Sequence, residues 1–166
     1  MRPARGLLAS PLLALALVVA FATPGRAQQA VPDIGLTDDA VKSVMDVARQ
    51  NITKARRADG TFVPKESPGE LSLPIMPLAD GRRIITAASL SAAAAWCGVE
   101  WQNSHYLRLM QQERASRRWS DKQMAYIGLL HGITQGTLER QHAASGACDD
   151  GTRSNVRQMI DAWWGR

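Results

Sequence analysis

The chain has 166 residues, of which 45% are hydrophobic and 21% are charged, and it contains two cysteines. Its formal net charge is +5, but three of the 20 basic residues and none of the 15 acidic ones lie within the first 27 positions, so the remainder carries +2. This small excess excludes nucleic-acid binding driven by overall charge, and the length fits one domain with a sizeable core.

The first 27 residues have the three parts of a secretory signal. Two arginines give a charged start, residues 7–22 form an apolar run, and Gly-Arg-Ala at 25–27 is a small-x-small cleavage site. We therefore predict cleavage after Ala27, a periplasmic or secreted protein, and no transmembrane segment after signal cleavage. Residues 28–166 are then expected to form a single helical domain.

An irregular arm is expected to lead to a helix that Thr37 can cap. Apolar residues recur at helical spacing along it, namely Val41, Val44, Met45, Ala48 and Ile52. We expect this helix to end near Arg57, with Lys54, Arg56 and Arg57 in its last turn, where cations interact favourably with exposed carbonyl groups.

Residues 58–81 contain four prolines and three glycines, which prevent a regular helix and remove strand donors. The segment is predicted to be an extended connector. Its many apolar residues indicate that part of it lies across the helices. The alternative is a disordered segment that folds on a partner.

Residues 82–117 lack proline and are rich in helix-forming residues. They predict either one long helix or two helices broken near Gly98. Two adjacent apolar stripes indicate a wide buried face in the middle of this segment.

Residues 120–141 are predicted to form the central helix. Ser120 and Gln123 have the spacing of a capping box. A packing groove is predicted along one face, where glycines recur every four residues at Gly128, Gly132 and Gly136. The alternative is a non-helical segment, since each glycine costs roughly 1 kcal/mol relative to alanine in a helix. In an antiparallel register the groove faces Met110, Tyr106 or Leu107, and Asn103.

An even pair of cysteines in an exported chain favours a disulfide between Cys97 and Cys148, with two buried free thiols as the alternative. Residues 97–117 and 121–143 are predicted to form helices of similar length. If the two helices are antiparallel, the chain comes back beside Cys97 just before Cys148, which supports the pairing. Thr152 or Asp150 can cap a last helix that reaches Trp163. The predicted fold is all-α: a small disulfide-linked bundle of about four helices with a proline-rich connector.

Residues 97–164 resemble small periplasmic HdeA-type acid-stress chaperones and similarly built type VI secretion immunity proteins. The resemblance lies in a helical cysteine, a chain reversal, Tyr126-Ile127-Gly128 in the next helix, a second cysteine at Cys148 and a terminal helix with Trp163. It implies an exported helical binding protein. Residues 28–81 have no counterpart in it, and no functional residue is carried over from those families.

Catalytic signatures for nucleophilic, phosphate-binding or zinc chemistry do not occur in the sequence. Glu139 and His142 form one Glu-x-x-His pair, whereas di-iron bundles need two such pairs and two further glutamates. His131 is interpreted as a hydrogen-bonded, partly buried histidine, with a ligand or acid/base role as the alternative. We therefore predict no catalytic residue, no metal ligand and no cofactor.

A basic cluster is expected near the turn between the two long helices and is a candidate patch for an anionic partner, with a solvated helix end as the alternative. Its members are Arg108, Arg114, Arg117, Arg118 and Lys122.

These patterns favour a non-enzymatic exported binding protein, either chaperone-like or inhibitor/immunity-like, whose partner is another envelope protein. One alternative is a small helical metal- or cofactor-binding protein of the cell envelope. An envelope enzyme is a less favoured alternative. The sequence predicts no nucleic-acid partner and does not fix the oligomeric state.

Overall fold

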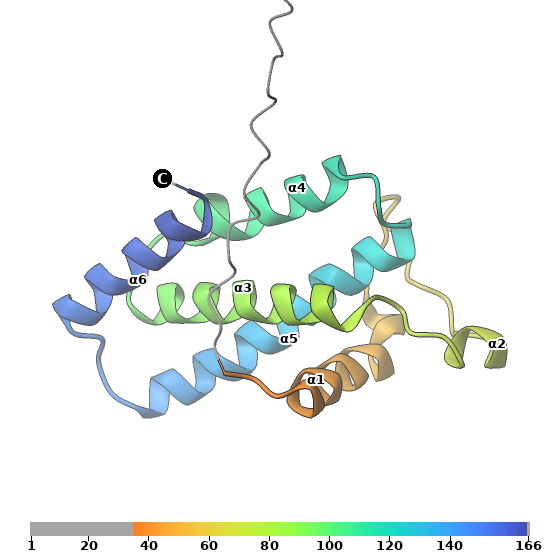
Figure 1. The fold of residues 1–166 in the computed structure, drawn as a ribbon, viewed down its shortest axis with the longest axis horizontal. Helices are drawn as coiled ribbons and strands as arrows, with labels where there is room; N and C mark the ends of the chain where they lie inside the picture. Colours follow the sequence, from red (N-terminus) through yellow and green to blue (C-terminus); the bar gives the residue numbers. More distant parts are fainter. Residues whose placement is uncertain (1–34, 166) are drawn as a thin grey trace, which may run out of the picture.

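The computed structural model describes residues 35–165, in which all regular secondary structure is helical (Figure 1). The predicted signal segment lies outside these residues. In chain order the elements are α1 (Asp38–Gln50), η1 (Ile52–Lys54), α2 (Pro68–Leu71), α3 (Leu78–Trp96), η2 (Gln102–Leu107), α4 (Arg108–Ala115), α5 (Asp121–Ala144) and α6 (Asp150–Trp163). The predicted small disulfide-linked helical fold is confirmed. Within this part of the chain, no helix is long and apolar enough to cross a bilayer.

Helices α3 and α5 form the centre of the molecule, with α1 on one side and α4 and α6 on the other (Figure 1). Small residues fill most of the buried face of α3, which lets α5 approach closely. At the crossing with α1, a Cβ atom at Gly81 would lie 2.2 Å from the Met45 sulfur, so a larger residue there would require the Met45 side chain to move. The core around this crossing includes Ile84, Ile85, Tyr126, Ile127 and Leu130.

The first helix is shorter than predicted. It begins at the Thr37 cap as expected, but it ends at Gln50 rather than near Arg57. A 3-10 turn follows, and residues 55–63 then form a tight hairpin in which Val63 N–H donates to the Ala55 carbonyl at 3.0 Å. Gly60 adopts a φ of +80° in this turn, a conformation that glycine tolerates without strain.

The connector at 58–81 is partly helical, which corrects the prediction of an extended segment. Ser67 and Glu70 form a capping box that begins the short helix α2. The last residues of the predicted connector, from Leu78 onward, are already the first turn of α3. Val63 and Met76 are each only 2% exposed, so the connector packs against the helices as predicted.

Residues 82–117 belong to two helical segments separated near Gly98, the second of the two alternatives. Helix α3 ends at Trp96, and Gly98 has a φ of +65°. The chain then enters the π-helical turn η2, in which the amides of His105 and Tyr106 both donate to the Trp101 carbonyl at 2.9 Å. Such π-turns occur frequently at functional sites.

The central helix has the predicted capping box, with Ser120 and Gln123 bonded in both directions. The Cys97–Cys148 disulfide is present and joins the end of α3 to the chain before α6. The cap of α6 differs from the prediction by one residue. Asp149, rather than Thr152 or Asp150, accepts the 2.7 Å hydrogen bond from the backbone N–H of Thr152.

Candidate functional site

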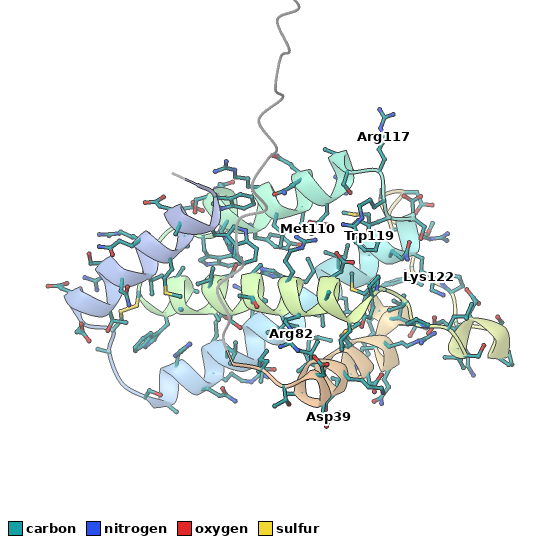
Figure 2. The ribbon with its side chains drawn as sticks, in the orientation of Figure 1. Asp39, Arg82, Met110, Arg117, Trp119 and Lys122 are labelled. Atoms are coloured by element: carbon teal, nitrogen blue, oxygen red, sulfur yellow. A yellow bond between two sulfur atoms is a disulfide. The ribbon has the colours of Figure 1, made fainter. Side chains whose placement is uncertain are left out.

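The strongest candidate site is a cleft of about 490 Å³ between the 55–63 hairpin, α4 and the first half of α5. We call it the arginine cleft, and define it by Arg56, Arg57 and Arg114 around a floor made by Tyr106, Met110, Trp119, Met124 and Gly128. Figure 2 shows Met110 beneath α4 and Trp119 beside the turn where α4 leads into α5. Asp121 is the one carboxylate among its lining residues.

The hairpin orders the first two arginines. The Arg56 Nη1 group donates to the Gly60 carbonyl at 2.8 Å, and its guanidinium lies 4.1 Å from the centre of the Phe62 ring. The Arg57 Nε group donates to the Thr61 hydroxyl at 3.1 Å. Asp59 holds the turn by accepting from both the amide and the hydroxyl of Thr61, and these bonds lower the pKa of Asp59. The arginines are thus preorganised by local contacts.

The Trp119 ring of the floor is positioned by a buried carboxylate. The Trp119 indole N–H donates to the buried Glu113 carboxylate at 2.7 Å. The other oxygen of Glu113 pairs with Arg83 of α3 at 2.7 Å. Because each oxygen of this carboxylate has a partner, Glu113 is held in place and fixes the ring of Trp119 at the cleft.

The predicted glycine groove exists at one of its three positions. A Cβ atom at Gly128 would lie 3.6 Å from the Tyr106 hydroxyl and 3.7 Å from the Met110 methyl group, two of the predicted neighbours. No atom lies within 4 Å of the corresponding position at Gly132, and at Gly136 only the side chain of Arg140 does. The prediction that large side chains fill the whole stripe is therefore wrong, because Gly132 is exposed and the Tyr106 ring packs against His131 instead.

Three of the five residues in the predicted basic cluster have interaction partners of their own within residues 35–165. Lys122 pairs with Glu66 and Glu70, Arg118 pairs with Asp80, and the guanidinium of Arg108 lies 4.3 Å from the Trp164 ring centre. Arg117 projects from the turn between α4 and α5 (Figure 2). Of the five, Arg114 is the one that lines the arginine cleft.

A buried ionic network anchors the connector beside this cleft. Glu66 is 8% exposed and accepts two hydrogen bonds from Arg49, at 2.8 and 3.0 Å. Its carboxylate also lies 2.9 Å from the Lys122 ammonium. The Arg49 hydrogen bond holds the pKa of Glu66 below its usual range, with Lys122 acting in the same sense.

Two histidines lie in the centre of the bundle, where α3, η2 and α5 meet. His105 is fully buried, and its Nε2 atom lies 3.1 Å from the Ala87 carbonyl oxygen, so this nitrogen carries the proton. His131 is 1% exposed, and its Nε2 atom lies 3.1 Å from the Ser91 hydroxyl. The interpretation of His131 as a hydrogen-bonded histidine is thus confirmed, and its burial is more complete than predicted.

Burial keeps both histidines neutral. It lowers the pKa of His105 to about 4, although the Ala87 carbonyl opposes the shift. It lowers the pKa of His131 to about 3, with the nearby His105 acting in the same direction. The His105 Nδ1 atom and the Trp164 indole N–H are buried without a hydrogen-bond partner among residues 35–165. Protonating either ring would place a charge in an apolar core.

The Glu139 and His142 side chains do not share a site. Glu139 accepts a 2.8 Å hydrogen bond from Gln135, whereas the ring of His142 stacks on Trp96 with the ring centres 4.9 Å apart. Across the described part of the chain, no group of three His, Cys, Asp or Glu residues could hold a metal ion.

Sequence reasoning missed Arg56 and Arg57 as site residues because it placed them in the last turn of a helix. The signal that could have found them is Asp59-Gly60, a dipeptide typical of tight hairpin turns. The sequence did not indicate that Glu66, Glu113 and His105 are buried. Each has a partner on another element of the fold, namely Arg49, Arg83 and Ala87.

Comparison of this chain with protein-family models, curated proteins and solved structures finds no match. The resemblance to HdeA-type chaperones and type VI immunity proteins stays a prediction.

Proposed function

We propose that this chain is a non-enzymatic exported binding protein of the inhibitor/immunity-like kind, which binds another envelope protein while it is itself folded. The observation that carries this proposal is the arginine cleft, because it combines cationic groups with an apolar and aromatic floor on one surface. Arginine and aromatic side chains are the residue types that contribute most to protein interfaces.

The support around the cleft favours a binding surface that is formed before the partner arrives. The hairpin orders Arg56 and Arg57, and the Glu113 carboxylate fixes Trp119. The disulfide closes the opposite side of the fold between Cys97 and Cys148. Preorganised side chains lose less conformational entropy on binding, which raises affinity without additional contacts.

A chaperone-like function is the second candidate, and the two buried histidines favour it. His105 and His131 are neutral in the folded bundle, so acid weakens the packing of α3, η2 and α5 around them. A protein of this kind would expose its apolar core reversibly at low pH and hold other unfolded proteins. It would not need a single partner.

The experiment that separates these functions is affinity capture from the exported fraction of the source cells, at neutral and at acid pH. We expect one stoichiometric protein partner at neutral pH. Reversible suppression of aggregation of several unrelated proteins at acid pH, without such a partner, would favour the chaperone-like function instead. The absence of both, together with a stoichiometric bound metal or heme, would refute the binding-protein proposal.

A further inference from the structure

The three arginines of the cleft form no ion pair within residues 35–165. Within residues 35–165, no carboxylate oxygen lies within 4.0 Å of the charged nitrogens of Arg56, Arg57 or Arg114. Two arginines near this end of the molecule are paired, Arg49 with Glu66 and Arg83 with Glu113. The fold thus places three arginines and one carboxylate, Asp121, around one hollow, which leaves an excess of positive charge there.

The floor of the cleft suits an apolar group. It contains the side chains of Met110, Met124 and Leu129 and the rings of Tyr106 and Trp119. Gly128 has no side chain, and a Cβ atom there would be in ordinary van der Waals contact with the Tyr106 hydroxyl at 3.6 Å and the Met110 methyl group at 3.7 Å, so these two side chains cover the helix at this point. Methionine side chains adapt to varied apolar partners, which suits a surface that receives a protein side chain.

We propose that the arginine cleft binds an acidic segment of a protein partner, in which one apolar side chain occupies the floor and flanking carboxylates pair with the arginines. This inference rests on the proposed function, since it names the chemistry of the partner. Arginine pairs with carboxylates in a bidentate manner, and each guanidinium here keeps N–H donors beyond those used in the hairpin. The positions of the arginines, on the hairpin and on α4, predict carboxylates on both sides of the apolar residue.

The test uses a library of random twelve-residue peptides displayed on phage, with the secreted product of the full chain as bait. We expect enrichment of peptides in which Asp or Glu flanks a bulky apolar residue. A synthetic copy of an enriched peptide should bind about tenfold or more weakly to Arg114→Gln, because a hydrogen bond between charged groups is lost. Arg57→Gln should weaken binding similarly, and added salt should weaken it further.

The matched control is Arg117→Gln, which removes the same charge at the nearby turn but outside the cleft. We expect its affinity to remain within about twofold of the unmodified protein, because that side chain does not line the cleft and salt screens its charge. Arg114 is exposed and makes no hydrogen bond through its side chain within residues 35–165, so its replacement leaves folding intact. Arg114→Gln therefore tests the cleft even if Arg57→Gln disturbs the hairpin.

The inference is overturned if no peptide is enriched, if the enriched peptides lack acidic residues, or if Arg114→Gln and Arg117→Gln bind them equally well. Failure of the inference and failure of the proposed function give different results. A stoichiometric partner whose affinity is unchanged by Arg114→Gln removes the acidic-segment inference and keeps the function. Acidic peptides that bind through Arg114, without any captured partner, support the chemistry of the cleft and remove the inhibitor-like function.

Discussion

The Tyr126 hydroxyl donates a 2.7 Å hydrogen bond to the carbonyl oxygen of Met45, which joins α5 to α1 inside the core. Burial raises the pKa of Tyr126, so the hydroxyl keeps its proton and remains a donor. The Met45 side chain also covers Gly81 of α3. Met45 therefore connects the three helices that position the hairpin and the floor of the arginine cleft.

Replacing Tyr126 by Phe removes this hydrogen bond and keeps the ring. We expect the free energy of unfolding to fall by about 1 to 3 kcal/mol, because the buried carbonyl loses a partner. Urea unfolding followed by tryptophan fluorescence measures the change. The control is Tyr106→Phe, whose hydroxyl has no hydrogen-bond partner within the described residues, and an equal loss in both variants would contradict the prediction.

The variant Glu66→Gln tests the ionic network that anchors the connector. It leaves Arg49 and Lys122 without their shared carboxylate, although Arg49 still donates to the Leu73 and Glu70 carbonyls at 2.8 and 2.6 Å. We expect the free energy of unfolding to fall by about 2 to 3 kcal/mol, which is somewhat less than the cost of leaving a fully buried charge unpaired. Chemical denaturation measures it. Asp46→Asn, which breaks an exposed pair with Lys42, should cost about 1 kcal/mol or less.

The parts of the fold that the sequence predicted are those with short-range signals. Ser120 and Gln123 are three residues apart, so the start of α5 could be read directly. The disulfide followed from the cysteine count and from the rise of two helices. By contrast, Arg49 and Glu66 are 17 residues apart, and no periodic pattern relates two such positions.

The arginine cleft was only partly predictable, for a similar reason. The stripe from Val41 to Ile52 keeps its apolar spacing through the 3-10 turn, so periodicity could not show that the helix had already ended at Gln50. Met110 was correctly predicted as a neighbour of Gly128 from the antiparallel register of the two helices, whereas Tyr106 was expected near Gly132 and lies near Gly128. That Arg57 and Arg114 line the same cleft depends instead on how the hairpin packs against the helices, which is a tertiary property.

Gly132 lies on the exposed side of α5, where an added methyl group meets no atom within 4 Å. Replacing Gly132 by Ala should therefore raise the free energy of unfolding by about 0.5 to 1 kcal/mol through helix propensity alone. Thermal melts check this. A destabilised variant would show that α5 packs against something at this position and would restore the longer groove.

The disulfide should contribute strongly to stability, because it closes a loop between residues 51 positions apart. In the loop-entropy model its removal costs about 4 kcal/mol. We expect a Cys97→Ala, Cys148→Ala double variant to unfold at correspondingly lower urea concentration, and reduction of the unmodified protein to have a similar effect. A loss under about 1 kcal/mol would mean that the unfolded chain is already compact without the bond.

The two buried histidines make a specific prediction about pH. Their ordinary pKa is 6.5, whereas the folded values are about 4 for His105 and about 3 for His131. Between pH 6.5 and these lower folded pKa values, the unfolded chain binds more protons than the folded one. The free energy of unfolding is therefore highest above pH 6.5 and falls as the pH decreases, by up to about 1.4 kcal/mol per pH unit for each histidine.

Urea unfolding between pH 7 and pH 5 isolates this effect, because the carboxylates remain largely ionised in that range. The variant His131→Gln keeps a group able to hydrogen-bond with Ser91 but cannot titrate, so the dependence on pH should fall to about half. His142→Gln is the matched control, since that ring lies at the end of α5 and is only partly buried. An unchanged slope in His131→Gln would mean that water reaches the folded core and that the histidine ionises there as freely as in the unfolded chain.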